Sequence, residues 1–182
     1  ERDLEVVALA ALLAEADGRR FLHRTAASWL RPRAGIAPRP PLRGADLPGR
    51  DGPGLIVAGS YVGRTGEQLA ALLAPGDLTH FQLPIAPLLD ARRPEFLEAA
   101  RRALADTLGA GHDAALSTAR EYVAGDTPGA GLAIGRAVSS ALCEIVAGVA
   151  ASARPGYLIA KGGITSHDLA ARGLGARRVD VL

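Results

Sequence analysis

The apolar positions near the start of the chain recur at helical spacing. Between Leu4 and Ala16 they return every three or four residues with acidic residues among them, and Asp17-Gly18 follows as a stop signal. We therefore expect a first helix over residues 4–16. Residues 21–25 have the character of a short strand, and residues 26–30 that of a short second helix.

Residues 31–53 show no apolar periodicity. They include six prolines and four glycines in 23 residues, a composition that supports neither a helix nor a central strand. We predict a linker or long ordered loop over residues 37–53. It separates residues 1–36, a helix and strand that precede the domain or pack on it, from a domain over residues 54–182.

From Gly54 onwards short apolar runs alternate with helical stretches. The first run, residues 55–58, is uniformly apolar, as expected of a strand buried on both faces. This alternation is typical of β-α units in a mostly parallel sheet, so we predict an α/β fold, a three-layer α/β/α sandwich. Its strands are expected at residues 55–58, 78–85, 114–116, 157–160 and 178–182, and its helices at 65–73, 93–108, 130–151 and 166–172.

The sequence stops inside the last of these strands and contains no methionine. Because a domain rarely ends within a strand, we expect either that the protein continues or that this strand lies at a sheet edge. We also expect the chain to be a processed product or a fragment of a longer protein, C-terminally incomplete.

The composition, 48% hydrophobic and 22% charged, is that of a folded soluble domain. The pI of 9.1 corresponds to a net charge of only +2, the arginines are scattered, and aromatic residues make up 4%, so we expect no nucleic-acid partner.

Cys143 is the single cysteine and cannot form an intramolecular disulfide. The apolar segment 130–151 is too interrupted by glycine and arginine for a membrane span. We expect a buried core helix there, and a cytoplasmic protein.

A glycine-bearing turn follows the first predicted strand, beginning at Gly59. Thr65 and Gln68 have the spacing of a capping box, so a helix should begin there with free backbone N–H groups, an arrangement that holds phosphate. This turn is not a Walker A loop, because its second glycine comes one residue early and Arg64 takes the place of the lysine. A structural turn without a ligand is an equal alternative.

A second turn repeats this design after the predicted strand 157–160. The Gly162-Gly163 pair lets a ligand approach the main chain, and the hydroxyls of Thr165 and Ser166 can donate to phosphate oxygens. Thr165 and Asp168 again have capping-box spacing. Two such turns, each after an apolar strand, favour a nucleotide or phosphate crevice.

Other chemistry-bearing residues are sparse. Lys161 is the only lysine beside 20 arginines, and its compact ammonium next to a glycine pair suits a phosphate contact. The four histidines and Cys143 have no metal-ligand spacing, so we expect no metal site and place Cys143 in the core. No nucleophile elbow or Ser-His-Asp set is evident, and the catalytic residues stay unknown.

The segment Gly129–Gly135 has glycines in the order G-x-G-x-x-x-G. This is superficially similar to a dinucleotide fingerprint, but the spacing differs and no clear strand precedes it. We predict a helix start with close helix packing.

Two strings together resemble a known family. Gly59-Ser60-Tyr61-Val62 with Thr65 and Gln68-Leu69, followed later by the run from Ile159 to Asp168, resembles the C-terminal nucleotide-binding domain of the four-carbon acid sugar kinases. Residues 21–36 also resemble the region just before that domain. The resemblance covers nearly the whole chain.

What the resemblance implies is transfer of the γ-phosphate of ATP, with Mg²⁺, to a hydroxyl of a tetronate or 3-oxo-tetronate. Family members have an N-terminal domain that binds the acid and supplies the chemistry, and that domain is missing here. The final glycine-rich segment of the family is missing too, so we expect the isolated fragment to be inactive and leave a homodimer open. With the two turns, the resemblance assigns ATP binding to Gly59, Ser60, Lys161, Gly162, Gly163, Ile164 and Thr165.

Two alternatives stay open at this point. A non-catalytic module that retains the kinase fold would recognise a phosphorylated metabolite without preference for a nucleoside. A protein-interaction module would show no stabilisation by small molecules and would carry a contiguous exposed apolar patch.

Overall fold

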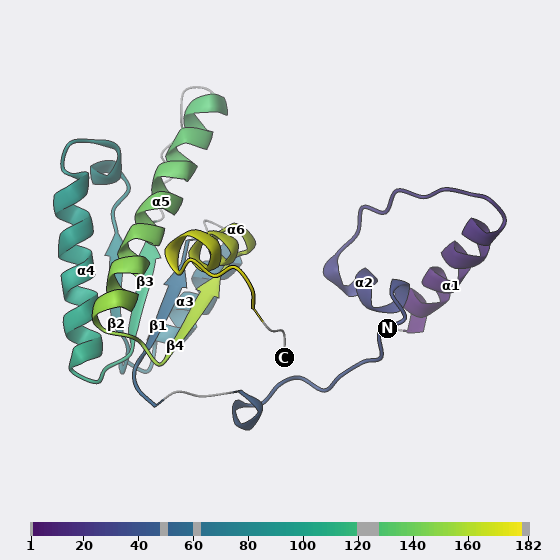
Figure 1. The fold of residues 1–182 in the computed structure, drawn as a ribbon, viewed down its shortest axis with the longest axis horizontal. Coiled ribbons are helices and arrows are strands. Elements are labelled where there is room, and N and C mark those ends of the chain that lie inside the picture. The colour runs from purple at the N-terminus through teal and green to yellow at the C-terminus, as the bar shows by residue number, and fades with distance from the viewer. Residues whose placement is uncertain (1, 48–50, 60–62, 120–127, 180–182) are drawn as a thin grey trace. The chain divides into compact units, whose positions relative to one another are not determined.

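The computed structural model describes residues 2–47, 51–59, 63–119 and 128–179. Its internal contacts divide the chain into two compact units, residues 1–47 and 48–182. The first unit contains two helices, and the second contains a parallel sheet with its covering helices (Figure 1).

The first unit is built on α1 (Arg2–Ala16) and α2 (Ala27–Arg33), which pack against each other. Ala8 and Trp29 are their buried apolar residues. The strand predicted at residues 21–25 was wrong, because this segment has no regular secondary structure. A lone strand has no neighbour to satisfy its backbone groups. Instead the His23 ring lies near the Trp29 indole, with ring centroids 5.4 Å apart.

The described residues of the second unit form a four-stranded, all-parallel sheet in the order β2-β3-β1-β4. Its strands are β1 (Gly54–Ala58), β2 (Thr79–Leu83), β3 (Ala114–Thr118) and β4 (Tyr157–Lys161). β1 and β3 take the inner positions and are buried along their whole length. Both strands consist of small or apolar residues on both faces apart from the end of β3, which is why they tolerate this burial.

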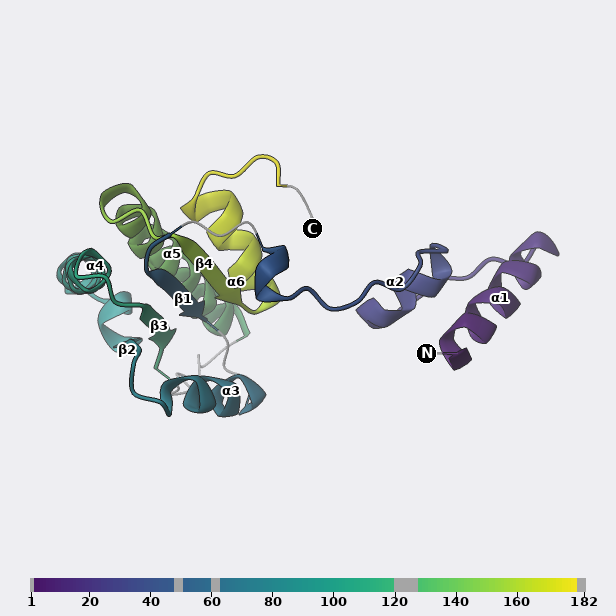
Figure 2. The same cartoon turned by 90° about the horizontal axis from the view of Figure 1, so that it is seen from below.

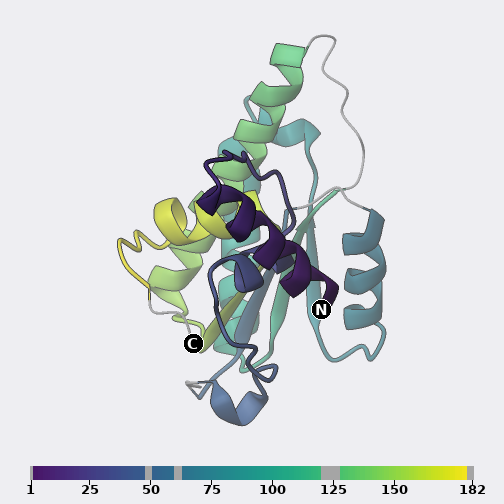
Figure 3. The same ribbon diagram turned by 90° about the vertical axis from the view of Figure 1, so that its right-hand side faces the viewer.

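Helices cover both faces of the sheet. α3 (Gly63–Leu73) lies on one face, and α4 (Arg93–Gly109) and α5 (Pro128–Ser152) lie on the other (Figures 2 and 3). Because crossovers between parallel strands are right-handed, the step from β1 outward to β2 and the later steps back across the sheet place their helices on opposite faces. The predicted three-layer α/β/α sandwich is confirmed.

Shorter elements complete the second unit. A 3₁₀ turn, η2 (Ala86–Leu89), follows β2, and α6 (Gly163–Asp168) runs into a π-helical turn, η3 (Leu169–Gly173). Four of the five predicted strands are confirmed. Of the fifth, expected at 178–182, residues 178 and 179 are not in a strand, and 180–182 lie outside the described residues.

The core lies between the sheet and the helices α4 and α5. Its buried side chains include Leu55, Val57, Leu104, Leu116, Ile145, Val146 and Val149. Cys143 belongs to this core, as predicted, and burial raises the pKa of its thiol above the ordinary value. The thiol therefore stays protonated and unreactive.

Only part of α5 is the buried core helix that the sequence predicted. Its buried residues run from Val138 to Val149, whereas residues 129–136 are exposed or half-buried and extend past the carboxyl ends of the strands (Figure 1). Among the described helices, this is the one with enough length and apolar composition to cross a membrane. Since its central residues pack against the sheet, it has the character of a core helix.

One carboxylate ties the amino ends of three strands together. Asp113 directly precedes β3, and its Oδ1 accepts a hydrogen bond from the Gly54 backbone N–H at 2.6 Å. Its Oδ2 accepts a second from the Tyr157 hydroxyl at 2.9 Å. These bonds fix the starts of β1 and β4 relative to β3, and burial, reinforced by Asp113, raises the pKa of Tyr157.

Candidate functional site

The two glycine turns selected from the sequence lie at adjacent strand ends. β1 and β4 are neighbours, and Ala58 pairs with Lys161. The chain leaves β1 towards α3 on one face of the sheet, and it leaves β4 towards α6 on the face of α5 (Figure 2). Such divergence between neighbouring parallel strands opens a crevice at their carboxyl ends, where α/β proteins bind ligands.

A cavity of about 480 Å³ occupies this crevice. This volume falls in the range of small-molecule sites, about 300–1,000 Å³. Its walls come from Gly59 after β1, from the turn after β4, from one face of α5 and from α6. The lining residues are Gly59, Leu132, Gly135, Arg136, Val138, Ser139, Leu142, Gly162, Gly163, Ile164, Thr165, Asp168 and Arg172.

Gly59 is required by packing. A Cβ at this position would lie 2.7 Å from the Thr165 Oγ1 and 2.8 Å from the Leu142 Cδ1, closer than real side chains approach. The end of β1 therefore sits directly on α6 and α5. We interpreted the glycine in this turn as room for a ligand, but at Gly59 the glycine is required by the packing of its neighbours.

The Gly162-Gly163 pair has a different character. Gly162 precedes α6 with a φ of 110°, a conformation that L side chains rarely adopt. Gly163 begins α6, and a Cβ built there meets no atom within 4 Å. The backbone of this turn therefore faces open space inside the cavity, as close approach of a ligand requires.

Both predicted capping boxes were wrong. α3 begins at Gly63 and α6 at Gly163, two residues before the threonines expected as caps. Thr65 and Thr165 are instead buried within the first turns of their helices, where Thr165 fills the space beside Gly59. The N-cap of α6 is a glycine without a side-chain hydrogen bond.

Of the two hydroxyls expected to donate to a phosphate, that of Ser166 is already engaged. Its Oγ donates to the Ala160 carbonyl oxygen at 3.0 Å, which ties α6 to the end of β4. Thr165 lines the cavity and is 9% exposed. A hydroxyl contact from this turn to a ligand would therefore come from Thr165.

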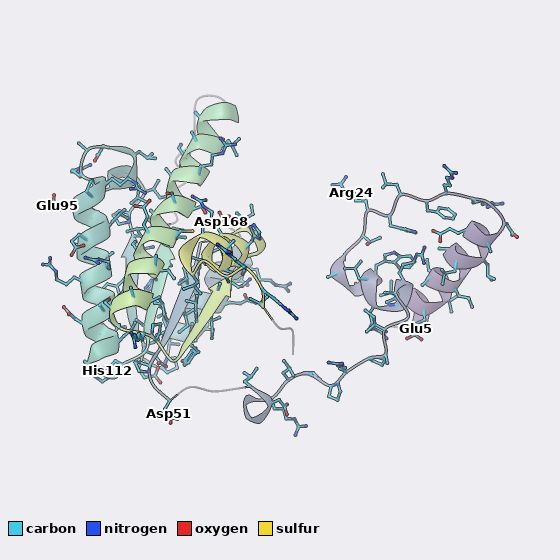
Figure 4. The ribbon with its side chains drawn as sticks, viewed as in Figure 1. Glu5, Arg24, Asp51, Glu95, His112 and Asp168 are labelled. Carbon is cyan, nitrogen blue, oxygen red and sulfur yellow. The ribbon has the colours of Figure 1, made fainter. Side chains whose placement is uncertain are left out.

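The charges in the cavity are partly neutralised. Asp168 is the last residue of α6 (Figure 4). The Ser139 hydroxyl of α5 donates to its Oδ2, and Arg172 Nη1 of η3 lies 3.7 Å from the same carboxylate oxygen. The side chain of Arg136, which also lines the cavity, forms no ion pair or hydrogen bond with any other residue that the structure describes. The lining therefore carries one uncompensated positive charge.

Five of the seven predicted nucleotide-binding residues meet in the cavity. Lys161 is not part of its lining: it follows Tyr157 and Ile159 in the alternation of β4, and those two side chains line a cavity on the α3 side. Ser60 lies outside the described residues. The five that line the cavity are Gly59, Gly162, Gly163, Ile164 and Thr165.

Sequence reasoning missed the α5 wall. Leu132, Gly135, Arg136 and Ser139 follow one another at i, i+3, i+4 and i+7, so they share one face of the helix. The glycines of this segment were expected to pack against another helix, but a Cβ at Gly131 or Gly135 meets nothing within 4 Å. The available signal was Arg136 together with three glycines, at positions 129, 131 and 135, in the otherwise apolar stretch 128–138.

A larger cavity, about 810 Å³, opens at the other end of the sheet. It includes residues that precede β1, β2 and β3, such as Pro53, Leu78 and Asp113. Parallel sheets bind ligands at the carboxyl ends of their strands, and here Asp113 is occupied in tying the strands together. The smaller cavity is therefore the better candidate. Within the described part of the chain, no cluster of three His, Cys, Asp or Glu residues could hold a metal ion.

Comparison with known proteins identifies the family of the second unit. The family described as the nucleotide-binding C-terminal domain matches residues 55–182. A Salmonella typhimurium LT2 protein, crystallised under the provisional description of a tRNA synthase, superposes with a TM-score of 0.52 and 21% sequence identity. The match covers 70% of this chain and 31% of that protein, and it shows a shared fold. No curated protein matches this chain.

Proposed function

Since this chain belongs to the nucleotide-binding C-terminal domain family, we propose that it is the ATP-binding portion of a sugar-acid kinase. The γ-phosphate of ATP would pass to a hydroxyl of a four-carbon acid sugar of the tetronate or 3-oxo-tetronate type. The observation that carries the proposal is that the open glycine turn after β4 lines a cavity at the carboxyl edge of a parallel sheet, beside the end of the neighbouring strand β1.

The turn after β4 would hold the phosphates. Gly163 leaves open space in front of the backbone, and the amide groups at the start of α6 have no side-chain cap to compete with a ligand. Thr165 would add a hydroxyl donor. Backbone N–H groups of a glycine turn can approach phosphate oxygens more closely than any turn shielded by a Cβ.

The metal would enter with the nucleotide. Asp168 is the one carboxylate among the described lining residues, and Ser139 and Arg172 already engage it. Mg²⁺ in kinases is commonly held by substrate phosphates plus one or two carboxylates, so a site with few acidic ligands fits this mode. The role of this chain would be to position the phosphoryl donor for in-line attack.

The acid-binding groups and the catalytic residues would lie in an N-terminal substrate domain. We propose that such a domain completes the enzyme, that the enzyme is cytoplasmic, and that the chain alone is inactive. Of the predicted nucleotide contacts, Ser60 and Lys161 stay proposals that rest on the resemblance.

The test is a thermal-shift titration of the full-length protein with Mg-ATP, Mg-ADP, a tetronate and a sugar phosphate, each alone. A ligand at about 100 times its Kd adds roughly 2.7 kcal/mol to the stability of a fold that binds it. We expect stabilisation by both nucleotides, and phosphorylation of the tetronate when ATP is also present.

The other outcomes separate the alternatives. Stabilisation by sugar phosphates without nucleotide preference would favour a phosphometabolite-binding module. The absence of any shift would favour a protein-interaction module. Nucleotide binding without phosphorylation of any four-carbon acid would leave a nucleotide-binding domain and contradict the kinase assignment.

A further inference from the structure

Arg136 differs from the other charged residues in the described cavity lining because its side chain has no partner there. It lies on the exposed N-terminal part of α5, between Gly135 and the buried segment that begins at Val138. Within the described residues its guanidinium has no carboxylate partner, whereas Arg172, which lines the same cavity, lies near the carboxylate of Asp168.

The other charges around the cavity cancel each other. Asp168 is matched by Arg172 and by the hydroxyl of Ser139. Lys161, which sequence reasoning selected as the phosphate contact, belongs to the other face of β4. The field inside the cavity is therefore that of one positive group on its α5 wall, which attracts an anion.

The open space around Arg136 is consistent with binding of an anion. Gly135 precedes Arg136, and a Cβ there meets no atom within 4 Å, so the helix surface next to the guanidinium is open. Across the cavity the turn at Gly163 is open as well. A guanidinium presents several donors in a planar fork that suits phosphate oxygens.

We propose that Arg136 binds the phosphate groups of the nucleotide from the α5 wall, while the glycine turn after β4 binds them from the other side. The inference rests on the proposed function, because it assigns a residue to the same cavity. In this proposal Arg136 makes the ionic contact with phosphate that the sequence pattern suggested for Lys161.

The test compares Arg136→Gln, Arg136→Lys and Arg102→Gln with the parent in the full-length protein. Arg102 is the matched control: it is also an arginine on a helix, it is exposed, and its contact with Glu98 is long at 3.4 Å. Affinities are measured by calorimetry for ATP, ADP, AMP, adenosine and inorganic tripolyphosphate, together with the melting temperature without ligand.

We expect Arg136→Gln to weaken ATP and tripolyphosphate binding about tenfold or more, to weaken AMP binding less, and to leave adenosine binding unchanged. Arg136→Lys should recover part of the loss, and Arg102→Gln should lose nothing. The salt dependence of ATP binding should also become shallower in Arg136→Gln, because one ionic contact is gone.

Each other result overturns the inference. Unchanged ATP affinity in Arg136→Gln would show that this residue is only a solvated surface arginine, with the nucleotide site itself intact. An equal loss for adenosine would indicate a structural role. If the parent protein binds ATP and tripolyphosphate no more tightly than adenosine, the cavity has no phosphate-binding region. If the parent protein binds none of the probes, the proposed function is wrong as well.

Discussion

At the level of single residues, glycines that look alike in the sequence have opposite roles. Gly59 is a packing residue, because Thr165 and Leu142 occupy the space that a side chain would need. Gly163 faces an open cavity. Only the second has the geometry of a ligand-binding glycine. A substitution at Gly59 should therefore change stability first, and a substitution at Gly163 should change ligand binding.

Gly163→Val should lower nucleotide affinity without unfolding the protein. The new side chain projects into empty space in the free fold but into the place assigned to the phosphates. We expect a free energy of unfolding within about 0.5 kcal/mol of the parent and an ATP Kd at least about tenfold higher. The control is Gly109→Val at the end of α4, also open, with no effect on ATP. Unchanged ATP affinity in Gly163→Val would contradict the phosphate assignment.

Gly59→Ala should act on stability first. Its Cβ would need to displace the side chains of Thr165 and Leu142, and such overpacking costs about 1–3 kcal/mol. Urea denaturation measures the loss. A variant as stable as the parent would mean that β1 does not end against α6 as described.

At the level of helices and strands, the two faces of the sheet are covered unequally. α4 and α5 bury the core on one face, whereas α3 buries only Thr65 and Gly66 on the other. On that thinly covered face, opposite the core residues with which they alternate, the His80 Nε2 and the Ser117 Oγ are 2.8 Å apart in a hydrogen bond between β2 and β3. Burial lowers the pKa of His80 from its ordinary value of 6.5.

This shift makes stability fall in mild acid. Between the lowered pKa and 6.5 the unfolded chain binds more protons than the folded one. The contribution of His80 is therefore complete above about pH 6.5 and is lost as the pH falls through the folded-state pKa. Urea denaturation at about pH 7.5 and about pH 5 should show a larger loss for the parent than for His80→Gln. Equal losses would mean that His80 has the same pKa in the folded and unfolded chains.

A second prediction at this level concerns a glycine in the exposed part of α5. Gly131 lies in its exposed part, its φ is outside the left-handed region, and a Cβ placed there meets no atom within 4 Å. Gly131→Ala should stabilise the protein by about 0.5–1 kcal/mol, because alanine loses less backbone entropy in a helix. Urea denaturation checks it. Destabilisation would mean that this part of α5 is not helical in solution.

Taken as a whole molecule, the chain consists of two units with separate interiors. The domain boundaries expected from the sequence, 1–36, 37–53 and 54–182, stay a prediction. The described residues 37–43 are exposed and have no regular structure before η1 (Gly44–Asp46). A proline- and glycine-rich segment of this kind is a preferred site of proteolysis.

Limited trypsin digestion should therefore cleave early after Arg43 or Arg50. Both bonds lie within the predicted linker, and the sheet with its helices should survive as one fragment beginning near residue 44 or 51. Mass spectrometry of the early products identifies the sites. Early cleavage inside α4 or α5 would contradict the division at this place.

Local patterns in the sequence were sufficient for most elements of the second unit. Apolar runs, helical spacing and glycine positions are local properties, so they predicted four strands of the sheet and its helices. They also selected residues 162–165, which line the cavity, while nucleotide binding there stays a prediction. The isolated segment at 21–25 was predicted wrongly because strand formation needs a partner that local pattern does not reveal.

Which residues meet depends on the folded chain. The order β2-β3-β1-β4 makes β1 and β4 neighbours, and this order depends on crossover connections between residues far apart in the chain. The same arrangement turns Arg136 towards the cavity and leaves Lys161 on the other face of the sheet. It also makes Gly59 a packing residue, since Leu142 and Thr165 reach it from separate helices. These relations are non-local, so no spacing within a motif encodes them.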